Sequence, residues 1–200
     1  MELLSIFNFP IYSFQASEHF TDKVLSDVKS LKWKKNMYNE VTEGDYYNKN
    51  LIDWFDICIE EIKKANAISA DIKLPVTACW ANKTTLLMKH HQHNHPNSFL
   101  SGIFYLTDNT GSETVFTLEN PLYKQFSGLN IGDHLISRVK PQKGNLIIFP
   151  SYLTHSVNTL KEHEVRYTVA FNVFLGGTFG TKTTTQLTFK TLSLHEKYEA

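Results

Sequence analysis

The hydrophobic pattern of the chain changes near residue 73, and this change limits the folds that are open to it. Before it, residues 17–31 and 48–69 carry apolar side chains at helical spacing, with Ser17 as a candidate N-cap of the first segment. After it, short β-branched and aromatic runs such as VTACWAN and NLIIF alternate with turn sequences. The sequence therefore predicts a mainly β (α+β) jelly roll or barrel, with two N-terminal helices packed on its outside.

The length of 200 residues suits one domain. We expect residues 1–72 to form a helical support and residues 73–200 to form the jelly-roll core. The 20 Lys+Arg balance the 20 Asp+Glu, and no basic stripe alternates with aromatic residues, which argues against a nucleic-acid partner. The sequence contains no apolar run of the ~18 residues that a membrane span requires.

The two cysteines and the start of the sequence favour a cytoplasmic protein. Cys58 and Cys79 lie in apolar surroundings without CxxC spacing, so we expect buried free thiols, which suit a reducing compartment. The N-terminal residues lack both a basic region and a small-residue cleavage site, so no export signal is predicted.

Four histidines occupy six positions in the segment KHHQHNHPNSFLSGIFYL, residues 89–106. If the segment is extended, His91, His93 and His95 share one face of a strand. Such a pattern is typical either of metal ligands or of histidines on a solvated surface, and the segment alone does not separate the two.

Two later segments favour the metal site. The segment FPSYLTH ends at His155, and VRYTVAFNVF places Arg166, Thr168 and Asn172 on one face of a strand whose other face is apolar. Inside a barrel, such a guanidinium can hold a carboxylate through paired hydrogen bonds. Two near-adjacent histidines, a distal histidine and a strand arginine match the layout of non-haem iron oxygenases that use 2-oxoglutarate.

The sequence also resembles a known family over residues 77–179. The segments HHQHNHPNSFLSGIFYL, WAN (residues 80–82), FPSYLTH and RYTVAFN (residues 166–172), followed by GGTFGTKTTTQLT, are similar to the 2-oxoglutarate- and iron(II)-dependent oxygenases of marine bacteria and cyanophages, related to the prolyl-hydroxylase group. The resemblance implies a double-stranded β-helix that uses iron(II) and 2-oxoglutarate as cofactors. One origin that it implies is a phage genome, in which case the protein would act in the cytoplasm of the host.

The resemblance implies three metal ligands. His93 and His155 match the first and the distal histidine of the family, and His95 stands where the family usually has an aspartate. A neutral imidazole compensates the charge of iron(II) less than a carboxylate does. Glu113, in GSETVF, and Glu119, in LENP, remain alternative carboxylate ligands.

Two further histidines precede the ligand pair. We expect His90 to face away from the metal. We expect His91 to lie behind the ligands or in solvent, and the alternative is that His91 is itself a metal ligand.

The resemblance also implies a cosubstrate site. Arg166 would pair with the distal carboxylate of 2-oxoglutarate, with Thr168 and Tyr105 adding hydroxyl groups and Asn82 and Asn172 adding amides. Two other expectations concern neighbouring residues: Trp80 belongs to the core, and the nearest acidic residues in sequence, Glu162 and Glu164, face solvent.

The expected activity is hydroxylation of an unidentified substrate, with 2-oxoglutarate and O2 converted to succinate and CO2. The substrate would be a small molecule or a side chain of a peptide or protein, and the oligomeric state stays open. The alternatives are a cupin-like metal-binding jelly roll or phage structural module without oxygenase activity, and a three-histidine dioxygenase that does not use 2-oxoglutarate. Four aromatic residues in loop-like segments could flank the barrel mouth: Tyr46, Tyr47, Tyr123 and Phe126.

Overall fold

The computed structural model describes residues 9–109, 111–118, 136–160, 163–180 and 183–199. The helices in these ranges are α1 (Glu18–Lys29), α2 (Lys49–Ala65) and α4 (Leu194–Tyr198). The strands are β1 (Tyr12–Gln15), β2 (Trp33–Lys35), β3 (Glu40–Thr42), β4 (Ile72–Lys73), β5 (Val76–Thr84), β6 (His90–His93), β7 (Leu100–Tyr105), β8 (Thr114–Thr117), β9 (Ile136–Val139), β10 (Asn145–Pro150), β11 (Thr154–Val157), β12 (Arg166–Val173), β13 (Gly176–Phe179) and β14 (Leu187–Phe189).

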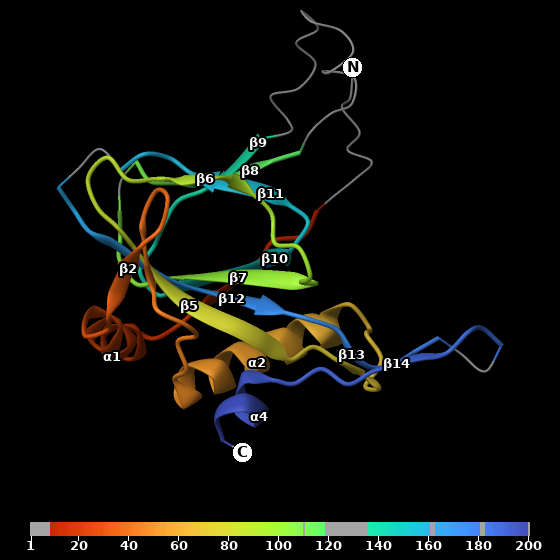
Figure 1. Ribbon diagram of the computed structural model, residues 1–200. Helices are drawn as coiled ribbons and strands as arrows, with labels where there is room; N and C mark the ends of the chain where they lie inside the picture. The colour runs from red at the N-terminus through yellow and green to blue at the C-terminus, as the bar shows by residue number, and fades with distance from the viewer. Residues whose placement is uncertain (1–8, 110, 119–135, 161–162, 181–182, 200) are drawn as a thin grey trace, which may run out of the picture.

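Two antiparallel sheets face each other, and a third, smaller sheet extends to one side (Figure 1). The large sheet has the order β1-β10-β7-β12-β5-β3-β2, the small sheet β6-β11-β8-β9, and the third sheet β14-β13-β4. Between β5 and β12 the chain passes repeatedly from one facing sheet to the other, as in a jelly roll. The predicted mainly β, two-sheet architecture is therefore present.

The two long helices form where the helical spacing predicts them. Ser17 accepts a hydrogen bond from the Phe20 backbone N–H at the start of α1, and Asn48 caps α2 in the same way through the Leu51 N–H. Both helices, together with α4, lie on the outer side of the large sheet in Figure 1. The apolar faces of the helices share one core with that sheet, in which Phe55 of α2 stacks on Phe171 of β12 at 4.1 Å between ring centroids.

The central strands of the large sheet are buried on both faces. In β10, Leu146 and Ile148 pack toward the helices, whereas Ile147 and Phe149 join a second core between the two sheets. Successive side chains of a strand point to opposite faces, so a strand with two buried faces has a continuous apolar sequence. The run NLIIF is explained in this way.

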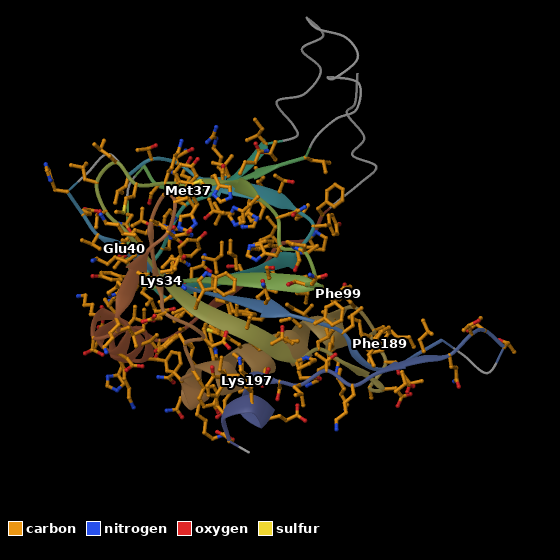
Figure 2. All side chains as sticks on the ribbon, viewed as in Figure 1. Lys34, Met37, Glu40, Phe99, Phe189 and Lys197 are labelled. Atoms are coloured by element: carbon orange, nitrogen blue, oxygen red, sulfur yellow. The ribbon has the colours of Figure 1, made fainter. Side chains whose placement is uncertain are left out.

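A hairpin of β2 and β3 extends the large sheet at one edge. It rises toward the small sheet, with Lys34 and Glu40 along its strands and Met37 at its tip (Figure 2). The tip contacts the start of β6, because the Lys89 backbone N–H donates to the carbonyl of Tyr38 at 3.2 Å. The hairpin therefore connects the two facing sheets.

Some sequence expectations can be compared directly with this fold. Cys58 and Cys79 are buried free thiols, as predicted. Tyr46 and Tyr47 do not flank the gap between the facing sheets: the Tyr46 hydroxyl donates to Asp27 at 2.6 Å, and that of Tyr47 lies 2.8 Å from His195. This expectation is wrong because the segment packs beside α1 and α4.

Four residues named in the sequence expectations lie outside the described ranges: Glu119, Tyr123, Phe126 and Glu162. In the described part of the chain, no helix combines the length and the apolar character that a membrane crossing requires.

Gly102 should be essential for the packing between β7 and α2. A Cβ atom at this position would lie 2.3 Å from the Phe171 ring, which cannot retreat because it stacks on Phe55. Gly102→Ala should lower the free energy of unfolding by about 1–3 kcal/mol in urea denaturation. Gly176→Ala is the matched control, because its Cβ would meet its neighbours at 3.5 Å, an ordinary contact. Equal stability of the two variants would contradict the explanation.

Candidate metal and cosubstrate site

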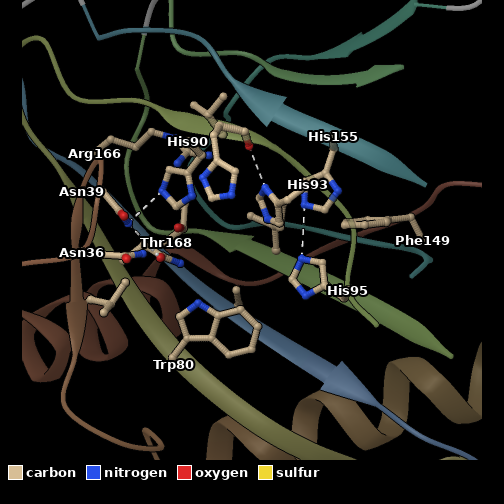
Figure 3. Close-up of a pocket in the computed structure, with 17 residues that line it drawn as sticks. Asn36, Asn39, Trp80, His90, His93, His95, Phe149, His155, Arg166 and Thr168 are labelled. Carbon is tan, nitrogen blue, oxygen red and sulfur yellow. Dashed lines mark hydrogen bonds between the residues drawn. The ribbon is translucent and has the colours of Figure 1, made fainter. Parts of the chain in front are cut away.

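A cavity of about 230 Å³ lies between the two facing sheets. Side chains from β5, β6, β11 and β12 and from the β2–β3 hairpin line it, and histidines form much of one wall (Figure 3). We call it the inter-sheet cavity. On the large sheet, its polar residues come from the inner faces of β5 and β12, whose outer faces are apolar, which follows from the alternation of side chains along a strand.

Strand pairing brings the distal histidine to the histidine-rich segment. His155 in β11 is the direct cross-strand partner of His93 in β6, and the ring centroids lie 4.4 Å apart. His95 follows β6, and its Nε2 lies 3.3 Å from the Nε2 of His155. One ligand nitrogen from each of the three residues lies within 4.8 Å of the other two, so His93, His95 and His155 form a group that could hold a metal ion.

Hydrogen bonds to backbone carbonyls orient two of these imidazoles. The Nδ1 of His93 lies 2.7 Å from the carbonyl oxygen of His91, and the Nδ1 of His155 lies 3.0 Å from that of Leu153. A carbonyl only accepts, so each Nδ1 carries the proton and each Nε2 keeps a free lone pair. Metal-binding histidines are usually held in this way.

The spacing between His95 and His155 also suits a metal. Two nitrogen ligands about 2.1 Å from one ion, at roughly a right angle, lie about 3 Å apart, close to the 3.3 Å between the Nε2 atoms. The backbone N–H of His95 donates to the Ser151 carbonyl at 3.0 Å, and its ring stacks on Trp80 with centroids 5.8 Å apart. His95 is thus held in place by both its backbone and its ring.

Burial keeps these imidazoles neutral at pH 7. Loss of solvation lowers the pKa of His155 to about 3 and that of His95 to about 4, and the neighbouring imidazoles lower both further. Loss of solvation also lowers the pKa of His93. A neutral imidazole has the lone pair that a metal ligand requires, so no deprotonation step is needed before a metal binds.

A β-bulge changes which histidines of the segment face the cavity. His155 pairs with His93 and Val157 pairs with His90, so β6 has one residue more than β11 across the same stretch. A bulge interrupts the alternation of side chains. His90 therefore lines the cavity, which corrects the expectation that it faces away. His91 is exposed, as one of its expectations predicted, and it also contributes to the cavity wall.

The carboxylate alternatives do not join the histidine group in the described part of the chain. Glu113 forms an ion pair with Arg138 at 3.7 Å instead, and the metal-ligand group found among the described residues contains only histidines. Glu119 lies outside the described residues.

Arg166 lies in the same cavity as the histidines and is almost completely buried, with 2% of its surface exposed. Its Nε and Nη2 atoms have no hydrogen-bond partner in the described protein. The Tyr105 ring lies 5.5 Å from the guanidinium carbon, and Glu164 accepts a hydrogen bond from Asn109 instead of pairing with Arg166. An uncompensated buried guanidinium costs several kcal/mol, so this cavity is suited to an anion.

Not all of the expected cosubstrate residues face the cavity. Thr168 and Asn82, which are direct cross-strand partners, both line it. Tyr105 lies behind Arg166, where its hydroxyl is 2.8 Å from that of Thr114. Asn172 accepts a hydrogen bond from Ser101 at 2.9 Å.

Sequence reasoning missed several residues of the cavity wall. Trp80 is half-buried and lines the cavity, which corrects its assignment to the core. Asn36 and Asn39 also line the cavity, although they lie far from the other site residues in sequence. No pattern in the polar stretch around them marks them, because their position depends on the pairing of β3 with β5.

Metal binding should depend on the three convergent imidazoles. His93→Ala or His155→Ala should abolish stoichiometric iron(II) uptake in an anaerobic titration, because each removes one of three ligands. His91→Ala and Glu113→Ala are controls, since neither side chain belongs to the histidine group. Full iron affinity in His95→Ala, combined with loss in Glu113→Ala, would contradict the ligand set.

The metal-free protein should lose stability as the pH falls below 6.5. The pKa values of His95 and His155 in the folded state lie below the ordinary 6.5, so at acidic pH the unfolded chain binds more protons. The contribution of these two neutral histidines to folding stability is complete above pH 6.5 and declines toward pH 4. The melting temperature should fall less steeply with decreasing pH in His155→Gln than in the wild type, as measured by thermal unfolding across this pH range. Identical slopes for the two proteins would contradict the explanation.

Comparison with known proteins supports an oxygenase site. Residues 78–172 match the model of the family described as "Putative 2OG-Fe(II) oxygenase". This range includes the three histidines of the metal group and Arg166. No curated protein matches the chain.

Several solved structures share the fold. A 2OG-Fe(II) oxygenase family oxidoreductase from Burkholderia pseudomallei superposes with a TM-score of 0.61 at 12% identity, covering 82% of this chain and 84% of that one. HygX from Streptomyces hygroscopicus, with nickel and 2-oxoglutarate bound, gives 0.62 at 10% identity, with 83% of each chain covered. The viral collagen prolyl hydroxylase of Paramecium Bursaria Chlorella virus-1, in complex with 2-oxoglutarate, gives 0.56 at 14% identity, covering 82% and 94%.

At these sequence identities the structural likeness shows a shared fold, and the match to the family model indicates the class of enzyme. The three-histidine group and the buried arginine, whose Nε and Nη2 atoms lack partners, fit the two cofactors of that class, iron(II) and 2-oxoglutarate. Residues 78–172 therefore match a 2-oxoglutarate- and iron(II)-dependent oxygenase domain, and this match together with the site supports a non-haem iron dioxygenase.

Proposed function

We propose that the protein hydroxylates an unactivated C–H bond of its substrate, with His93, His95 and His155 holding iron(II) and Arg166 holding the distal carboxylate of 2-oxoglutarate. One observation carries this proposal. A fully buried guanidinium with unpaired Nε and Nη2 atoms shares a cavity with three convergent imidazoles. A metal-binding protein without oxygenase activity would have no use for such an arginine beside its metal ligands.

The charges of the cavity support a dicarboxylate as its ligand. The three imidazoles are neutral, so iron(II) and Arg166 together bring three positive charges into a buried space. No ion pair of Arg166 is found within the described residues. A dicarboxylate that reaches from the metal to Arg166 would compensate two of these charges, and the guanidinium fork matches the shape of a carboxylate.

Iron(II) and 2-oxoglutarate, when bound, supply an oxidation in which O2 and 2-oxoglutarate become succinate and CO2 while a substrate C–H bond becomes an alcohol. The residues of this chain orient the reactants. Thr168 would add a hydroxyl next to Arg166, and Tyr105, fixed to Thr114 of the opposite sheet, supports the guanidinium from behind. Apolar side chains such as Ile103, Phe149 and Val157 line the same cavity and exclude water from it.

The substrate would be a small molecule or a side chain of a peptide. The described cavity is about 230 Å³, which leaves little room beside 2-oxoglutarate. We therefore propose that only the reacting part of the substrate enters and that the remainder stays outside.

A second candidate is a three-histidine dioxygenase that binds its substrate directly to iron. The absence of a carboxylate from the histidine group of the described residues favours it. It provides no partner for Arg166, however. Anaerobic addition of 2-oxoglutarate to the iron(II) protein separates the candidates, since only a chelated 2-oxo acid produces a weak visible charge-transfer band.

Arg166→Lys should weaken 2-oxoglutarate binding by one to two orders of magnitude, roughly 1.5–3 kcal/mol, because lysine keeps the charge but loses the two-pronged hydrogen bond. Calorimetry with iron(II) present and oxygen excluded measures this affinity. Iron binding should be unchanged in Arg166→Lys, which also shows that the variant folds. Equal 2-oxoglutarate affinity in the wild type and in Arg166→Ala would refute the cosubstrate assignment.

A further inference from the structure

The β2–β3 hairpin reaches the inter-sheet cavity from outside the family-matched segment. Its turn is closed by a hydrogen bond from the Asn36 backbone N–H to the Asn39 carbonyl at 2.8 Å. At its tip, the Tyr38 carbonyl accepts the Lys89 N–H, and the Tyr38 ring lies 5.4 Å from that of His91. The hairpin is thus fixed to the start of β6, and Asn39, only 3% exposed, lies on the cavity side.

Asn39 determines how His90 can act. Its Nδ2 lies 3.2 Å from Asn82 Oδ1 and 3.0 Å from His90 Nε2. An amide nitrogen only donates hydrogen bonds, so the Nε2 of His90 is the acceptor. A neutral imidazole that accepts at Nε2 carries its proton on Nδ1. Asn39 therefore selects the tautomer of His90 whose Nδ1–H is a donor.

His90 lies close to the arginine end of the cavity. The β-bulge in β6 turns its ring inward, and it lines the cavity together with Arg166 and Thr168. Figure 3 shows the ring beside Asn39, to which it is hydrogen-bonded, in the part of the cavity that also holds Arg166 and Thr168. No hydrogen bond to the His90 Nδ1 occurs within the described residues, so this donor is available to a ligand.

We propose that His90 and Asn39 belong to the cosubstrate site: His90 donates its Nδ1–H to the anion that Arg166 holds, and Asn39 is the residue that positions His90. This inference rests on the proposed function. It extends the site beyond the family-matched segment, to the β2–β3 hairpin that carries Asn39. The anion would then meet a guanidinium, the Thr168 hydroxyl and an imidazole N–H.

Two substitutions of His90 distinguish its nitrogens. In His90→Asn the side-chain amide takes the place of Nδ1 and keeps a donor there, whereas in His90→Gln it takes the place of Nε2 and the Nδ1 donor is lost. The dissociation constant of 2-oxoglutarate is measured by anaerobic calorimetry on the iron(II) protein. We expect a value within about threefold of wild type for His90→Asn and at least about tenfold weaker binding for His90→Gln, as for a lost hydrogen bond to a charged group.

Asn39→Ala should weaken 2-oxoglutarate binding several-fold, because it releases His90 into both tautomers. Met37→Ala is the matched control on the same hairpin, since Met37 is 76% exposed at the tip, and it should bind like the wild type. Iron(II) stoichiometry is measured for every variant and should stay at the wild-type value, which shows that the fold and the metal group are intact.

The outcomes separate this inference from the proposed function. If the wild type does not bind 2-oxoglutarate, the proposed function fails and the inference fails with it. If the wild type binds but His90→Gln and Asn39→Ala bind equally well, only the inference is overturned. Stronger binding by His90→Gln than by His90→Asn would refute the tautomer, and a loss of iron together with 2-oxoglutarate would assign the pair to the metal site instead.

Discussion

The position of β12 between β5 and β7 is the constraint on which the rest of the structure depends. Its apolar face, with Val169 and Phe171, packs against the helices, and its polar face, with Arg166 and Thr168, forms the floor of the inter-sheet cavity. A shift of one residue in the pairing would exchange the two faces and bury the guanidinium among the helices. The register that completes the core thus also places Arg166 in the cavity.

The metal group and the arginine are held by different elements. Backbone carbonyls orient His93 and His155 on the small sheet, whereas Arg166 lies on the large sheet, with Tyr105 behind it. The hydrogen bond between Tyr105 and Thr114 joins the two sheets behind this cavity. A ligand that touches both the metal and the arginine would therefore connect the sheets, and its binding would stabilise their relative position.

If His95 takes the place of the usual carboxylate ligand, as we propose, the protein ligands bring no negative charge to the metal. The Nε2 atoms of His95 and His155 remain at a distance that one metal ion can accommodate. The missing negative charge must then come from the ligands that enter the cavity. Under this proposal, the anionic cosubstrate would contribute more to charge compensation here than in a site with a protein carboxylate.

The sequence by itself determined the two helices and the mainly β core, because periodicity specifies which residues share a face. The resemblance to a known family, and not periodicity, singled out His93, His155 and Arg166, and the pairing of β6 with β11 brings the two histidines together. Only the tertiary structure placed His90, Trp80 and Asn39 in the cavity wall. The bulge in β6 breaks the alternation from which the orientation of His90 was predicted. Asn39 reaches the cavity through a strand pairing across more than 40 positions of sequence, from Val41 to Asn82. Such placements depend on the register between distant strands, which no local pattern encodes.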